Sequence, residues 1–163
     1  MCKFDFIVIG VAKSGTTSLH HMLKNENKIS LPGSKELPLF NKEFDFQICD
    51  FFEDNNIDSS KIAGKITPQY FTDYLALKRI YNHNKKVKII VILRDPIDRL
   101  VSHFKMFLSR GLTNKKLEDL FEEYLEGNID DNMKNIFLDS QYDKALKEIY
   151  SIFKREDVLI LNF

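Results

Sequence analysis

Glycines, a lysine and hydroxyl residues lie close together near the start of the chain, in the run Gly10-Val11-Ala12-Lys13-Ser14-Gly15-Thr16-Thr17-Ser18. An apolar stretch, Phe6 to Ile9, precedes this run, and the spaced apolar residues of a helix follow it. Glycines let a loop turn closely around an anion, and the first N–H groups of a helix are unpaired and point toward it. The segment therefore predicts a phosphate- or sulfate-binding loop.

This loop differs from the common nucleotide-binding pattern at one position. In the pattern G-x-x-x-x-G-K-[ST] a lysine follows the second glycine, whereas Thr16 stands there in this chain. A P-loop kinase would lose its contact to the β- and γ-phosphates. The lysine of this loop is Lys13, which lies within the loop and is placed to contact a group shorter than the β- and γ-phosphates of a nucleotide. A glycine turn with a purely structural role is the alternative interpretation.

A second cationic motif follows the clearest strand pattern of the sequence, Val87 to Leu93. Asp95 is a favourable N-cap for the next helix, and Pro96 is accepted at the first helical position. Ligands of open α/β sheets bind beyond the carboxyl ends of strands, so we expect Arg94 to face an anion there. Ser102 lies about two helical turns further on, on the same face. The alternative is a capped turn in which Arg94 pairs with a nearby aspartate.

Strand and helix patterns alternate around these motifs. We predict strands at 6–9, 29–31, 61–66, 87–93 and 158–161, and helices after the loop, at 44–52, at 75–81, after Asp95, at 117–125 and at 142–153. This order predicts a three-layer α/β fold, a parallel sheet with helices on both faces, in a single domain over residues 1–163.

A loop between two prolines carries the pair Lys35 and Glu36. Judged by residue type alone, a single glutamate in a loop is a solvated charge. We consider the pair a candidate functional site only because it lies, in the sequence, between the anion loop and the Arg94 motif.

Together, these motifs resemble sulfotransferases that use 3′-phosphoadenosine 5′-phosphosulfate (PAPS), in the branch that includes the heparan sulfate enzymes. The resemblance implies a P-loop-like architecture and a catalytic base at Glu36. It implies that the 5′-phosphosulfate binds to Lys13, Ser14, Gly15, Thr16, Thr17 and Ser18, and the 3′-phosphate to Arg94 and Ser102. Lys13 would also stabilise charge during transfer. Lys35 and Lys65 are candidate substrate contacts, although Lys65 stands where family members commonly have glutamate.

The function expected from this resemblance is transfer of a sulfuryl group from PAPS to a hydroxyl or amine, on a carbohydrate acceptor and without a metal. Two alternatives stay open: a non-catalytic module that binds adenosine 3′,5′-bisphosphate (PAP), and a P-loop nucleotide kinase. The chain corresponds to roughly the first two-thirds of a family domain, so we expect either a fragment or a reduced version of the domain.

The composition of the chain indicates which partners, cysteine states and cellular location to expect. The chain has 24 Lys and Arg residues against 24 Asp and Glu residues, and no basic tract with interleaved aromatics, so we expect no nucleic-acid partner. Two cysteines, Cys2 and Cys49, cannot form a disulfide framework, and we expect both to be buried or partly buried thiols. Without an apolar run of membrane-spanning length or a signal peptide, we expect a cytoplasmic protein.

Overall fold

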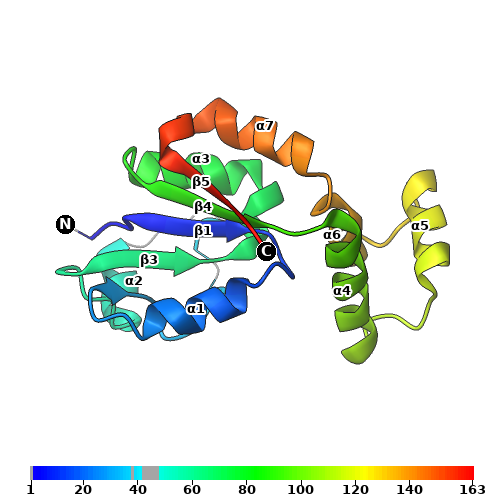
Figure 1. Cartoon of the computed structure of the whole chain (residues 1–163), viewed down its shortest axis with the longest axis horizontal. Helices are drawn as coiled ribbons and strands as arrows, with labels where there is room; N and C mark the ends of the chain where they lie inside the picture. Colours follow the sequence, from blue (N-terminus) through cyan, green and yellow to red (C-terminus); the bar gives the residue numbers. More distant parts are fainter. Residues whose placement is uncertain (1, 38, 42–47) are drawn as a thin grey trace.

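The computed structural model describes residues 2–37, 39–41 and 48–163, and strands and helices alternate along it (Figure 1). The strands are β1 (Phe6–Gly10), β2 (Ile29–Ser30), β3 (Ile62–Ile66), β4 (Lys88–Leu93) and β5 (Val158–Asn162). The α-helices are α1 (Thr16–Lys24), α2 (Ile48–Asp54), α3 (Tyr74–His83), α4 (Pro96–Ser109), α5 (Leu117–Glu126), α6 (Asp131–Leu138) and α7 (Tyr142–Ile152). Short 3-10 helices, η1 (Pro68–Thr72) and η2 (Arg155–Asp157), precede α3 and β5. Residues 44–47 of the helix predicted at 44–52 lie outside the described residues.

All five strands belong to one parallel sheet with the order β2-β3-β1-β4-β5. The central strand β1 is buried along its whole length. This agrees with its run of β-branched and aromatic residues, since a parallel strand covered on both faces reads as a continuous apolar run. The predicted α/β fold is therefore confirmed.

Helices cover both faces of the sheet, and the side chains of β1 point alternately to each. Ile7 and Ile9 join the larger core, to which α3 and α7 contribute Leu77, Ile80 and Ile149. Phe6 and Val8 face the opposite layer, where Leu19 and Leu23 of α1 pack. Figure 1 shows α3 and α7 on one side of the sheet and α1 on the other.

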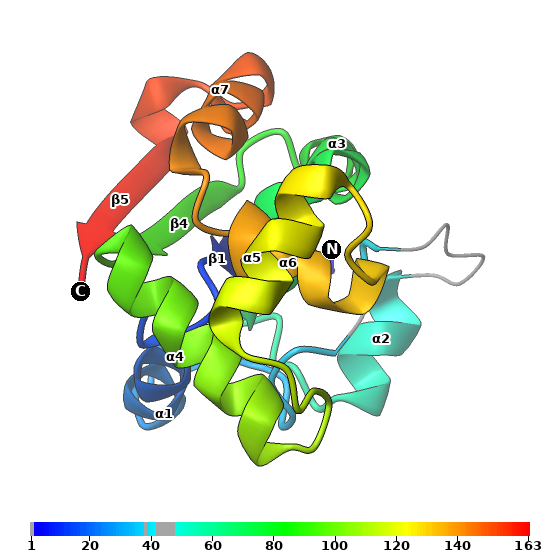
Figure 2. The same cartoon turned by 90° about the vertical axis from the view of Figure 1, so that its right-hand side faces the viewer.

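Helices α4, α5 and α6 gather at the carboxyl ends of the strands, as the turned view shows (Figure 2). They share a separate core built on Phe107, Leu120, Ile136 and Phe137. Helix α6 is not among the helices predicted from the sequence. Its position places a polar helix face beside the end of the sheet where the anion loop lies.

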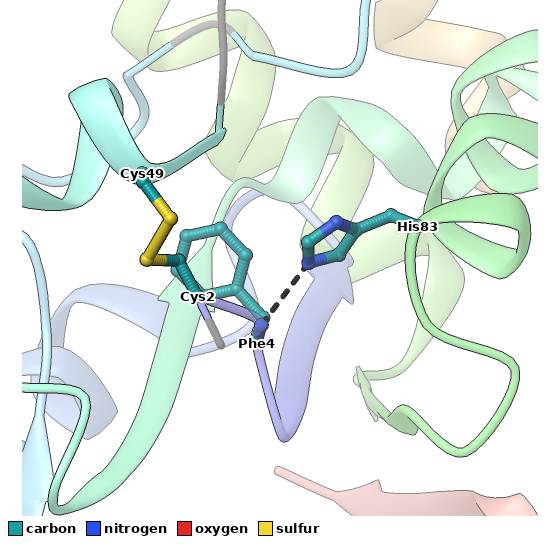
Figure 3. The surroundings of a disulfide bond; sticks show 4 residues. All are labelled: Cys2, Phe4, Cys49 and His83. Carbon is teal, nitrogen blue, oxygen red and sulfur yellow. Dashed lines mark hydrogen bonds between the residues drawn. A yellow bond between two sulfur atoms is a disulfide. The ribbon is translucent and has the colours of Figure 1, made fainter.

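The two cysteines form a disulfide, so the expectation of two free thiols is wrong. Cys2, just before β1, is bonded to Cys49 of α2, with their Cα atoms 5.2 Å apart (Figure 3). Next to the bond, the Phe4 N–H donates to Nε2 of His83 over 3.1 Å. Structural disulfides are typical of oxidising compartments. The cytoplasmic location stays a prediction, and the disulfide argues against it.

Among the described residues, no helix is both long and apolar enough to cross a membrane.

Candidate functional site

The anion loop joins β1 to α1 at the carboxyl edge of the sheet. Gly15 is the N-cap of α1 with φ 77°, in the left-handed region, and no side chain caps the helix there. A Cβ at Gly15 would lie 2.6 Å from the ring of Phe163, so both the backbone and the available space require glycine. The N–H groups of the first helical turn are thus left free for an anion.

Lys13 is the cation within this loop, and it also has a left-handed backbone, with φ 73°. Partial burial lowers the pKa of Lys13, and the positive charges of Arg110, Lys35 and Arg94 lower it further. Several positive charges therefore lie close to Lys13, and an anion bound among them would relieve their mutual repulsion.

Arg94 lies at the end of β4, where the sequence predicts it. The Asp95 carboxylate accepts hydrogen bonds from the N–H groups of Ile97 and Asp98, and Pro96 begins α4, which confirms the predicted cap. Nη1 of Arg94 is 3.4 Å from the carbonyl oxygen of Lys13, and Nη2 is 3.9 Å from Asp98. The guanidinium also lies 5.6 Å from the centre of the Phe163 ring. Arg94 therefore borders the anion loop.

Glu36 also lies beside the anion loop, and Lys35 links the two. Lys35 Nζ is 2.5 Å from Glu36 Oε1 and 3.1 Å from Thr17 Oγ1, so it connects the glutamate to α1. The Gln69 amide donates to Glu36 Oε2 over 3.2 Å. Burial acts to raise the pKa of Glu36, but the hydrogen bonds and charge of Lys35, together with Gln69 and Arg110, outweigh it and lower the pKa. The carboxylate is therefore ionised at neutral pH.

These groups line one cavity of about 440 Å³. Of the residues proposed from the sequence, those in its wall are Lys13, Gly15, Thr16, Thr17, Lys35, Glu36 and Arg94. Ser14, Ser18, Ser102 and Lys65 are not in the wall. Ser14 and Lys65 are buried, and Lys65 donates instead to the carbonyl of Leu37.

The remaining wall of the cavity contains residues that were not predicted as site residues from the sequence. It is formed by Gln69, Thr72, His103, Met106, Phe107, Arg110, Asn132, Asn135, Asp139 and Phe163. Most come from η1, α4 and α6. Half of them carry amide, hydroxyl or guanidinium groups, and such groups hydrogen-bond to hydroxyl-bearing ligands.

A buried arginine holds this wall in place. Arg99 is 0% exposed; its Nε donates to Ser140 Oγ over 2.8 Å, and a second guanidinium nitrogen donates to the carbonyl of Ile136. Its Nη1 lies 3.0 Å from Nδ1 of His103 and 3.9 Å from Asp139. Burial raises the pKa of Asp139 to about 6, and burial together with the charge of Arg99 lowers the pKa of His103 to about 4. Arg99 thereby ties α4 to α6.

A family model described as "Sulfotransferase domain" matches residues 3–163. The chain belongs to the sulfotransferase family. A relative from Dictyostelium discoideum, "Membrane-associated sulfotransferase kil1", is 29% identical over 168 residues, covering 99% of this chain and 36% of that protein. Human "Heparan sulfate glucosamine 3-O-sulfotransferase 3B1" is 31% identical over 128 residues, covering 76% and 32%. The chain thus spans about a third of the length of these relatives.

Solved structures of other sulfotransferases share the fold. A sulfotransferase from Alicyclobacillus acidocaldarius superposes with a TM-score of 0.84 at 18% identity, over 99% of this chain and 74% of that one. Mouse sulfotransferase SULT7A1 complexed with PAP gives a TM-score of 0.58 at 20% identity, over 99% and 51%. The sheet and helices of this chain therefore form the P-loop-like architecture of sulfotransferases.

Proposed function

We propose that this sulfotransferase chain carries the donor site and the catalytic base for transfer of a sulfuryl group from PAPS to a hydroxyl or amine of a carbohydrate. The observation that carries the proposal is the bridge of Lys35 between Thr17 of the anion loop and Glu36. It brings a carboxylate that can accept a proton next to the place where the phosphosulfate would bind.

The residues of the loop fit a phosphosulfate. The helix N-terminus has no side-chain cap, Gly15 adopts the left-handed backbone that begins the helix, and Lys13 adds a cation beside it. Arg94 at the neighbouring strand end would bind the 3′-phosphate, which distinguishes PAPS from ATP. Ser102 would complete that contact only if its hydroxyl reached the phosphate from α4, so Arg94 carries this part of the proposal.

Bound PAPS supplies an electrophilic sulfur and a phosphate leaving group. Glu36 accepts the proton of the acceptor hydroxyl or amine as the new O–S or N–S bond forms and the S–O bond to the phosphate breaks. Lys13 and the N–H groups of Gly15, Thr16 and Thr17 stabilise the charge that develops on the departing phosphate. Lys35 holds the Glu36 carboxylate in place and beside the loop.

The polar groups of the remaining cavity wall support a carbohydrate acceptor. Gln69, Asn132 and Asn135 present amides to the cavity, and such groups can donate to and accept from sugar hydroxyls. The names of the heparan sulfate relatives agree with an acceptor of this class.

Calorimetric titration with PAP, ADP and ATP·Mg²⁺ tests the donor site. We expect a clear preference for PAP. Equal affinity for PAP and ADP would contradict the 3′-phosphate assignment, and PAP binding without transfer to any of a panel of saccharides would favour a non-catalytic binding module.

A further inference from the structure

Lys65 is a buried lysine in the middle of β3, and it faces the protein interior. It is 1% exposed, its Nζ donates to the carbonyl of Leu37 over 2.5 Å, and the same nitrogen lies 5.3 Å from the ring centre of Phe51. The described residues place no carboxylate within ion-pair distance of it. Its hydrogen bond is therefore made to the loop that carries Glu36.

Burying an ammonium group is unfavourable, and here burial lowers the pKa of Lys65 to about 7. An apolar side chain of similar length, such as methionine, would fill the same space without that cost. What it could not supply is the hydrogen bond to Leu37. The polar end of Lys65 thus matters for the loop rather than for packing.

Residues of β3 and η1 hold the loop that carries Glu36 through several hydrogen bonds. The N–H of Glu36 donates to the carbonyl of Ile66 over 3.2 Å, and the N–H groups of Leu39 and Phe40 donate to Tyr70 Oη over 3.3 and 3.1 Å. Between these two anchors, the carbonyl of Leu37 is held by Lys65. The chain needs this support because Glu36 has φ 63°, a conformation that is unfavourable for a residue with a side chain.

We propose that Lys65 is a positioning residue: by holding the Leu37 carbonyl, it keeps Glu36 facing the anion loop, beside Lys35. The catalytic meaning of this role rests on the proposed function, in which Glu36 is the base. The structural role stands on the hydrogen bonds alone.

Titration of the Glu36 carboxyl by NMR tests the proposal without donor or acceptor. In Lys65→Met the loop loses its central anchor, Glu36 moves away from Lys35, and its lowered pKa returns toward the ordinary 4.5. Lys61→Met, a change at an exposed lysine just before β3, is the matched control and should leave the pKa of Glu36 unchanged. An unchanged Glu36 pKa in a folded Lys65→Met protein would overturn the proposal.

A second measurement uses the unsubstituted protein and does not depend on folding of the variant. The ε-methylene signal of Lys65 should titrate near pH 7, because burial, which the contact with Leu37 requires, lowers the pKa of its amine. Titration near pH 10, as in an exposed lysine, would overturn the proposed contact.

Activity then separates this proposal from the proposed function. If both hold, Lys65→Met lowers kcat at least tenfold and leaves PAP affinity unchanged. If the Glu36 pKa moves but a measurable transfer rate does not, Lys65 still positions the loop, and it is the role of Glu36 as the base that fails.

Discussion

Lys35 Nζ and Glu36 Oε1 lie 2.5 Å apart, although the two residues are adjacent in the chain and their side chains would normally diverge. Glu36 has a left-handed backbone, and the second hydrogen bond of Lys35, to Thr17, holds the pair beside the anion loop. A lysine so placed keeps its neighbour ionised and positioned. The contact therefore holds an ionised carboxylate where it can accept a proton, and the lowered pKa of Glu36 makes it a weaker base than a free glutamate.

Glu36→Gln should retain PAP binding and lose transfer, by roughly 10²–10⁴-fold in kcat, because an amide cannot accept the acceptor proton. Rates and PAP affinity measured on the same preparation check this. Glu26→Gln, at an exposed position, is the control. Near-normal transfer by Glu36→Gln would remove Glu36 from the reaction.

Arg94→Ala should weaken the binding of PAP by about 1.5–3 kcal/mol, the usual range for a lost hydrogen bond to a charged group. The binding of ADP should be weakened much less. Calorimetry with both nucleotides measures the difference. Asp98→Asn removes the ion-pair partner of Arg94 and keeps the guanidinium, so it should leave the preference for PAP intact. An equal loss for both nucleotides in Arg94→Ala would place the 3′-phosphate elsewhere.

Gly15→Ala and Gly127→Ala form a matched pair, with φ values of 77° and 78°. Both introduce backbone strain of about 1 kcal/mol. Only at Gly15 would the new Cβ meet another group, the Phe163 ring at 2.6 Å, whereas nothing lies within 4 Å at Gly127. We expect Gly15→Ala to lower PAP affinity at least tenfold and Gly127→Ala to leave it unchanged. Similar PAP affinities for the two variants would show that the loop does not bind the nucleotide.

Asp139 and His103 should give opposite slopes to a plot of stability against pH. The pKa of Asp139 is higher in the folded state, about 6 against 3.8, so its contribution to stability falls as pH rises from 4 to 6. The pKa of His103 is lower in the folded state, about 4 against 6.5, so its contribution rises over nearly the same window.

The two slopes oppose each other in the unsubstituted protein, and single substitutions separate them. Relative to the unsubstituted protein, Asp139→Asn should make the slope of stability against pH more positive between about pH 4 and 6, and His103→Gln should make it more negative between about pH 4 and 6.5. Urea unfolding across this range measures both. Parallel curves for the two variants would contradict the assignment.

Cys2→Ser should lower the free energy of unfolding by about 2–4 kcal/mol, because the bond to Cys49 closes a long loop of the unfolded chain. Thermal unfolding with and without a reductant checks this: the reductant should destabilise the unsubstituted protein and have no effect on the variant. A protein that is indifferent to reductant would lack the bond in solution.

Much of the fold follows from local signals in the sequence. The β-branched runs before Lys13 and Arg94 identify β1 and β4, and Asp95 with Pro96 marks the start of α4, because these signals depend on neighbouring residues only. The helix α6 also had a signal that the sequence analysis did not use. Asp130 is its N-cap, and Met133, Ile136 and Phe137 recur at helical spacing.

Other features depend on contacts that no local pattern contains. The position of Lys65 under the Glu36 loop requires β3 and residues 35–37 to be folded together, and a lysine within a strand ordinarily reads as exposed. The disulfide joins residues 47 positions apart, and two cysteines alone do not reveal whether their Cβ atoms meet. The part of the cavity wall that α4 and α6 form depends on the contacts of Arg99 and on the core that the two helices share.

The contact of Phe163 with Gly15 and Arg94 has a consequence for biosynthesis. A ribosome releases Gly15 early and Phe163 only after β4 and all the helices have emerged. Until β5 pairs with β4, Gly15 lacks the neighbouring Phe163 ring. Donor nucleotide added to a translation reaction would therefore stabilise the fold only once β5 has emerged and paired with β4, and would give little help to a shorter nascent chain.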